Sequence, residues 1–66
     1  MKSALRKGDR IKDLELEFKG KVLEVLSTQF MVVITKVPSK CNFFVPGDVV
    51  TYFYKDENST WRRKEC

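Results

Sequence analysis

The chain has 66 residues, of which 42% are hydrophobic and 33% charged, and its 13 basic and 9 acidic side chains give a formal net charge of +4. A chain of this length forms one domain with a small core, which excludes a deep catalytic cleft. No apolar run reaches the length of a membrane span, and no apolar stretch of the secretory kind follows the basic start, so we expect a cytoplasmic protein.

The residue types that carry most enzyme and metal chemistry are scarce. The chain contains no histidine and two cysteines, Cys41 and Cys66. Histidine is the commonest general base, and a metal site needs three or four suitable ligands at short spacing. We therefore expect no catalytic residue, no metal and no cofactor. Because the cytosol keeps thiols reduced, we expect both cysteines to be free, with a bridge between them as the alternative.

The first residues are basic and carry little to bury. We expect residues 1–7 to form a basic N-terminal arm ahead of a single domain over residues 8–66. Gly8-Asp9 then precedes Arg10–Leu14, in which polar and apolar residues alternate. Alternation at period two predicts a half-buried first strand there.

The longest apolar tract, Glu17–Val37, is rich in β-branched residues. Its polar break, Ser27-Thr28-Gln29, predicts a hairpin with arms at Phe18–Leu26 and Gln29–Val37. Apolar residues in the first arm do not alternate cleanly, so we expect a bulge or bend near Gly20 or Glu24. Both faces of the second arm are apolar, which indicates a strand covered on both sides or an interface.

The remaining third of the chain reads as short strands and turns. The segment Cys41–Val45 is either an edge strand or a loop, and Pro46-Gly47-Asp48 is a strong turn signal. We expect a strand at Val49–Tyr54, a polar loop at Lys55–Ser59 and a closing strand at Thr60–Lys64. Five short strands in this length expose one face unless they close, so the prediction is an all-β protein, a small five-stranded barrel with tight hairpin connections.

One stretch has a recognisable pattern. Gly8–Lys12 followed by Phe18–Val25 resembles the KOW motif of ribosomal proteins and transcription elongation factors, in which a G-D-x-V strand leads to a K-G-x-x-G-x-V hairpin. The resemblance covers roughly the first third of the chain, and the acidic Glu15–Glu17 stands between its two parts. It implies an SH3-like barrel, whose first and last strands pair, and RNA, a ribosome or a polymerase as the partner.

Phosphate contact needs lysine or arginine on a common face, and base stacking needs exposed aromatic rings among them. Pairing of the first and last strands places Arg10, Lys12, Arg62 and Lys64 in one stripe. We therefore predict a non-enzymatic nucleic-acid-binding barrel, with RNA favoured over DNA. Trp61 is a stacking candidate for which core packing is the favoured alternative. The predicted phosphate contacts are Arg10, Lys12, Lys19, Lys21, Arg62 and Arg63, and the predicted stacking residues are Tyr52, Tyr54 and Trp61.

The competing prediction is a protein-interaction or adaptor module that regulates a larger complex, as a monomer or a homodimer. Its surface would combine Met31, Val33, Phe43 and Phe44 with the face that carries Tyr52 and Tyr54. An uncovered apolar patch of this kind suits a protein partner.

Overall fold

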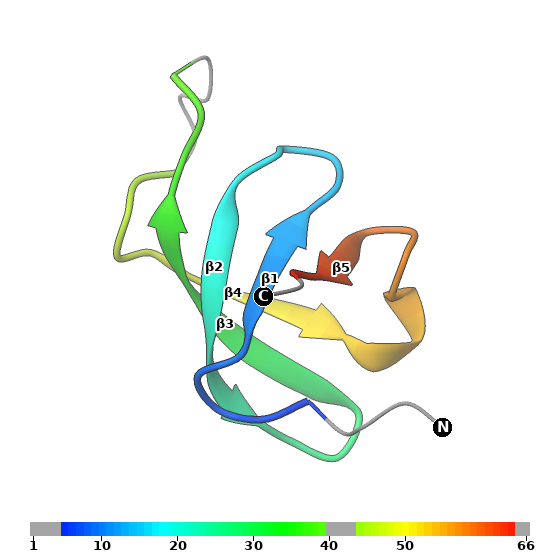
Figure 1. Cartoon of the computed structure of the whole chain (residues 1–66). Helices are drawn as coiled ribbons and strands as arrows, with labels where there is room; N and C mark the ends of the chain where they lie inside the picture. Colours follow the sequence, from blue (N-terminus) through cyan, green and yellow to red (C-terminus); the bar gives the residue numbers. More distant parts are fainter. Residues whose placement is uncertain (1–4, 40–43, 65–66) are drawn as a thin grey trace.

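A computed structural model describes residues 5–39 and 44–64 (Figure 1). The described chain contains five antiparallel strands and one short 3-10 turn, which confirms the all-β prediction. Residues 41–43 and Cys66 lie outside the described residues, and so does the prediction that both cysteines are free, while Phe44 and Val45 belong to no strand. The elements are β1 (Arg10–Asp13), β2 (Lys19–Val25), β3 (Gln29–Lys36), β4 (Val49–Phe53), η1 (Tyr54–Asp56) and β5 (Trp61–Arg63).

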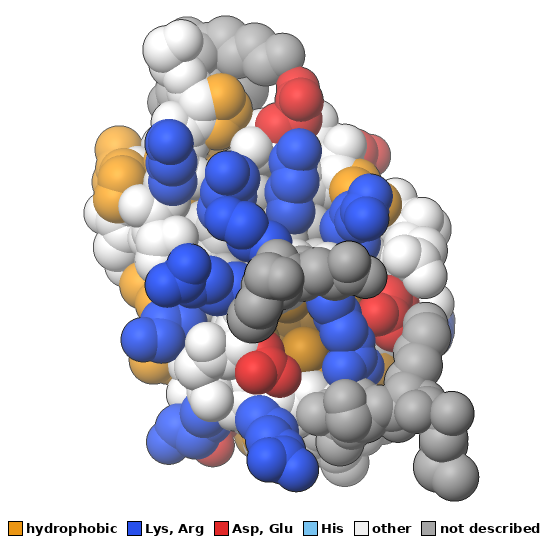
Figure 2. All heavy atoms as spheres, viewed as in Figure 1, with side chains coloured by type: hydrophobic (Ala, Val, Ile, Leu, Met, Phe, Trp, Pro, Cys, Tyr) orange, Lys and Arg blue, Asp and Glu red, His pale blue; other side chains and the backbone are white. Residues whose placement is uncertain are grey.

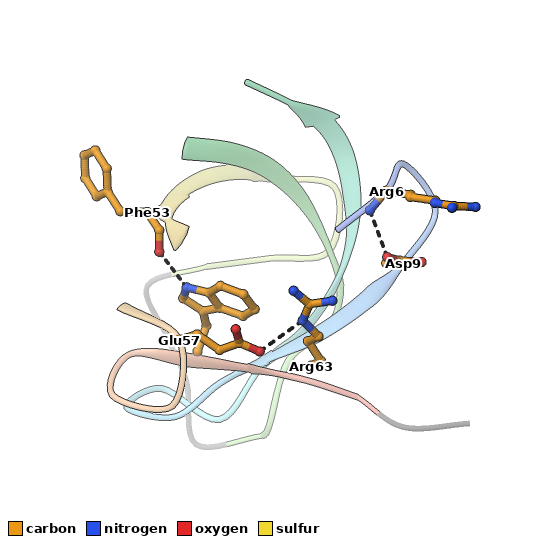
Figure 3. A network of polar contacts seen from close by, with 6 residues as sticks. Arg6, Asp9, Phe53, Glu57 and Arg63 are labelled. Carbon is orange, nitrogen blue, oxygen red and sulfur yellow. Dashed lines mark hydrogen bonds and ion pairs between the residues drawn. The ribbon is translucent and has the colours of Figure 1, made fainter. Parts of the chain in front are cut away.

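The strands form one sheet in the order β4-β3-β2-β1-β5, which curls into a half-barrel (Figure 1). The first and last strands pair, as expected, with Lys12 opposite Arg62. This order leaves β4 and β5 as the two edges. The Trp61 indole N–H donates to the Phe53 carbonyl at 2.8 Å and so links the two edges (dashed line at Phe53 in Figure 3).

Two irregularities bend the central hairpin. The β2–β3 register shifts between Lys19 and Gly20 and again between Val22 and Glu24, which confirms the predicted bulge. A Cβ atom at Gly20 would overlap the Val32 side chain and would lie 3.0 Å from the carbonyl oxygen of Val33. The strands can approach this closely because Gly20 has no side chain. Bulges increase local twist, which lets a short sheet curl over its own core.

The core lies on the inner face of the half-barrel and is centred on Phe30. The Tyr52 and Tyr54 rings stack on Phe30 at centroid distances of 5.7 and 5.3 Å, and Trp61 meets it edge-on at 4.8 Å. Burial alternates strictly along the first six residues of β3, so one face of this strand is buried and the other, although apolar, is only partly covered. The buried hydrophobic residues are Leu5, Ile11, Phe18, Val22, Phe30, Val32, Ile34, Tyr52 and Trp61.

The beginning of the described chain is docked on the sheet. Leu5 is buried in the core, the Arg6 N–H donates to the Asp9 carboxylate at 2.9 Å, and the Asp9 N–H donates back to the Arg6 carbonyl at 3.1 Å (Figure 3). Residues 5–7 therefore belong to the folded domain rather than to an arm. Residues 1–4 lie outside the described part of the chain.

A buried carboxylate holds the β1–β2 turn. Asp13 Oδ1 accepts hydrogen bonds from the N–H groups of Glu15 at 2.9 Å and Leu16 at 2.7 Å, and Oδ2 accepts one from the Tyr52 hydroxyl at 2.7 Å. Glu17 closes this turn with φ of 62°. Both carboxylate oxygens have donors, which is the condition for burying such a group. Asp13 thus ties the turn to β4, on the far side of the core.

Replacement of Tyr52 by phenylalanine is expected to lower the free energy of unfolding by about 1–3 kcal/mol, because Asp13 Oδ2 would lose its donor while buried. Urea unfolding at neutral pH measures this change. The matched control is Tyr54→Phe, whose hydroxyl donates to the Leu26 carbonyl at 2.8 Å in an exposed position. We expect a smaller loss from the control.

The Tyr52 hydroxyl should also make the stability of the protein depend on pH in the alkaline range. Burial, followed by the hydrogen bond and the charge of Asp13, raises the pKa of Tyr52 far above its ordinary value. The neutral hydroxyl therefore stabilises the fold below the unfolded-state pKa of about 10, and this contribution is lost as the pH rises above it. Wild type should lose stability more steeply above pH ~10 than Tyr52→Phe does. Parallel curves would contradict the prediction.

Candidate nucleic-acid interface

The outer surface of the sheet gathers cationic side chains from four strands and from the residue after β5. Residues opposite each other in an antiparallel ladder share a face. Arg10 lies opposite Lys21, and Lys12 lies opposite both Lys19 and Arg62. Figure 2 shows Lys and Arg side chains across the face over β1 and β2. We call this surface the basic face; it comprises Arg10, Lys12, Lys19, Lys21, Lys36, Arg62 and Lys64.

The ladder orders these side chains in two rows. One row crosses β5, β1, β2 and β3 through Arg62, Lys12, Lys19 and Lys36. The second row starts at Lys64, whose N–H donates to the Arg10 carbonyl at 2.9 Å, and continues to Arg10 and Lys21. Neighbouring strands lie about 4.8 Å apart and alternate residues about 6.7 Å apart, so the first row spans about 14 Å at the backbone. This area is large enough to contact more than one phosphate.

Part of the basic face is hollowed. A concavity of roughly 460 Å³ opens between β1, β2, β3 and the end of β5. Gly20 contributes no side chain to it, and the Thr35 hydroxyl at its rim donates to the Lys19 carbonyl at 3.3 Å. Among the described residues that line it there are cations but no carboxylate. The lining residues are Arg10, Lys19, Gly20, Lys21, Thr35, Lys36 and Lys64.

Lys19 lies within a cluster of like charges. The positive charge of Lys64, and then that of Lys36, lowers the pKa of Lys19 below its ordinary value. A neighbouring cation disfavours the protonated amine, whereas a bound anion favours it. The free protein therefore holds these cations together against their mutual repulsion, and a phosphate group in the concavity would relieve that repulsion.

One predicted phosphate contact lies elsewhere. Arg63 is opposite Ile11 in the β1–β5 ladder, so it is on the other face of the sheet from Arg62. Its Nε lies 3.0 Å from Glu57 Oε2 in a partly buried ion pair (Figure 3). Arg63 therefore does not belong to the basic face. Lys36 does belong to it, and its position opposite Lys19 depends on the bulged β2–β3 register.

The three predicted stacking residues all pack against the core. Trp61 is fully buried, and Tyr52 is 6% exposed. Tyr54 is half-buried, packs its ring against Phe30 and uses its hydroxyl to bond the Leu26 carbonyl. The structure thus corrects the stacking role of Tyr52 and favours the core role over the stacking role for Trp61, because a buried ring cannot contact a base. Large aromatic rings bury much apolar area, so in a small domain they fill the core.

The residues of the alternative interaction surface are also separated. Met31 and Val33 are half-buried on the outer face of β3, whereas Tyr52 points to the inner face. Phe44 is half-buried, with its ring 5.4 Å from that of Phe18. Phe43 lies outside the described residues. The predicted patch that joined Met31 and Val33 to Tyr52 is therefore wrong.

Comparisons with protein-family models, curated proteins and solved structures find no match. Within residues 5–39 and 44–64, no helix is long and apolar enough to cross a membrane. The same residues contain no group of three or more His, Cys, Asp or Glu side chains that could hold a metal ion. The basic face is therefore identified as a candidate interface from its geometry and its charge.

Proposed function

We propose that this protein binds nucleic acid, with RNA favoured over DNA, through its basic face and without catalysing a reaction. The observation that carries the proposal is the convergence of cationic side chains from β1, β2, β3 and the end of β5 around one concavity. Lysine and arginine on a common face are what phosphate binding requires, and each contact releases a counterion from the nucleic acid.

The burial of the aromatic residues limits which parts of a nucleic acid the protein can contact. With Tyr52 and Trp61 in the core, binding depends on phosphates rather than on stacked bases. Phosphate contacts carry no sequence information directly, so we propose weak dependence on sequence. The resemblance of residues 8–25 to the KOW motif is what favours RNA, and the proposed location is the cytoplasm.

The proposal is tested by titrating the protein into fluorescent RNA and DNA of random sequence and equal length, over a series of salt concentrations. We expect micromolar binding at low ionic strength. The plot of log affinity against log salt should have a slope of about −0.9 per phosphate contact for a DNA duplex and about −0.7 for a single strand. Binding that is absent at low salt, or that does not weaken with salt, would contradict the proposal. Stronger binding of RNA than of DNA would support the finer assignment.

A further inference from the structure

The concavity in the basic face gathers more positive charge than one phosphodiester group carries negative charge. In the part of the chain that the structure describes, none of its cations forms an ion pair, whereas Arg63 on the other face pairs with Glu57. A phosphodiester has one negative charge, but a phosphate monoester has about −1.5 to −2 at pH 7 and three strong acceptor oxygens. Attraction to the cations grows in proportion to the charge of the ligand, so the concavity favours the monoester. Its five cations are Arg10, Lys19, Lys21, Lys36 and Lys64.

These cations surround the concavity rather than follow one line. Lys19 lies opposite Lys36 across β2 and β3. Arg10 lies opposite Lys21 across β1 and β2, and Lys64 is bonded through its N–H to the Arg10 carbonyl. Neighbouring strands are about 4.8 Å apart and alternate residues about 6.7 Å apart, so these long side chains can converge on one bound group. Lys64 and then Lys36 lower the pKa of Lys19, which shows that their charges already interact.

Beyond the concavity, the cations continue on one side only. Lys12 and Arg62, which lie opposite each other on β1 and β5, extend the first row away from the concavity without lining it. On the other side, the residue opposite Lys21 is Val33, and the residue opposite Val33 is Val49. The strand β4 contains no charged residue. Phosphates that follow the one in the concavity can therefore be bound on one side but not on both.

We propose that the concavity binds the terminal phosphate monoester of a nucleic-acid strand, and that the following phosphates lie over Lys12 and Arg62. This inference rests on the proposed function and adds to it the part of the strand that the concavity recognises. A terminal phosphate has a second negative charge and a free end, which match a surrounded cluster of cations at the end of a row. Phosphates at the 5′ and 3′ ends share this chemistry, so the experiment includes both.

The test compares three short RNA strands of the same random composition, labelled at an internal base. They have a 5′-phosphate, a 3′-phosphate, or hydroxyl groups at both ends. At constant ionic strength, at least one phosphorylated strand should bind about tenfold more tightly than the hydroxyl strand, the effect expected from added hydrogen bonds to a charged group. A phosphate monoester loses its second charge with a pKa of about 6. The preference should therefore fall between about pH 7.5 and pH 5.5, because phosphodiesters keep their charge over that range.

Two double variants with equal loss of charge locate the effect. Lys36→Gln with Lys64→Gln alters the concavity, and the three strands should then bind within about threefold of one another. Lys12→Gln with Arg62→Gln alters the basic face outside the concavity, so it should weaken all three strands and keep the preference. Equal changes of the preference in both double variants would overturn the inference.

The outcomes also separate this inference from the proposed function. Salt-dependent binding of all three strands with equal affinity would overturn the terminal-phosphate site and leave the proposed function standing. Absence of binding to any strand would overturn both. Inorganic phosphate is the remaining arm of the experiment. If it binds as tightly as the phosphorylated strand, the concavity is a site for the free ion, and the assignment to a strand end is wrong.

Discussion

Trp61→Ala is expected to leave the protein largely unfolded at 25 °C. Trp61 is fully buried, its ring lies 4.8 Å from the centre of Phe30, and its N–H bonds to the Phe53 carbonyl. Truncation of a buried tryptophan costs about 3–5 kcal/mol. A core in a chain of this size rarely supplies more than about 3–5 kcal/mol. The loss therefore matches the whole stability of the domain, and circular dichroism with urea titration measures it.

Two further variants separate a core role from a surface role. Trp61→Phe keeps most of the buried ring but loses the N–H bond to Phe53, so we expect a folded protein destabilised by about 1–2 kcal/mol with unchanged nucleic-acid affinity. Leu26→Ala removes an apolar side chain that is 45% exposed and should change stability little. A folded Trp61→Ala protein with reduced affinity would instead indicate that the ring contacts the ligand.

Lys19→Glu is expected to weaken nucleic-acid binding by about tenfold or more at low salt. Lys19 is central in the basic face, opposite both Lys12 and Lys36. Loss of one phosphate contact should reduce the salt slope by about 0.9 on a DNA duplex or about 0.7 on a single strand. The carboxylate would also repel the phosphates that we propose the neighbouring cations bind. Fluorescence anisotropy over a salt series measures both effects.

The stability of the same variant distinguishes binding from folding. Lys64 and Lys36 disfavour the charged form of Lys19, so a glutamate there replaces repulsion with attraction. We expect the thermal midpoint of Lys19→Glu to stay level or rise while its affinity falls. Lys55→Glu, on η1 and outside the basic face, makes the same change in net charge and is the matched control. Equal losses of affinity in both variants would show that net charge, rather than the basic face, controls binding.

Much of the architecture could be predicted because it depends on local pattern. The alternation in Arg10–Leu14, the polar break at Ser27-Thr28-Gln29 and the turn at Pro46-Gly47-Asp48 are short-range signals, and the strands lie within a residue or two of their predicted ends. The bulge near Gly20 could also be predicted from the local sequence, since a residue without a side chain permits close approach of two strands.

The candidate site was only partly predictable, because a face is defined by strand pairing. The expected pairing of the first and last strands brings together Arg10, Lys12 and Arg62, and the ladder confirms that pairing. Arg63 follows Arg62 in the chain, yet one step along a strand turns a side chain to the opposite face. Lys36 is distant from Lys19 in sequence and meets it through a bulged register that no local pattern specifies.

The sequence by itself determined the all-β fold, the hairpin and the excess of positive charge, because period-two alternation, turn residues and composition are properties of the chain. Only the tertiary structure decided which aromatic rings fill the core, which cations share a face, and that Asp13 is buried against Tyr52. Those outcomes depend on contacts between residues far apart in the chain, where register and burial are set by the whole sheet.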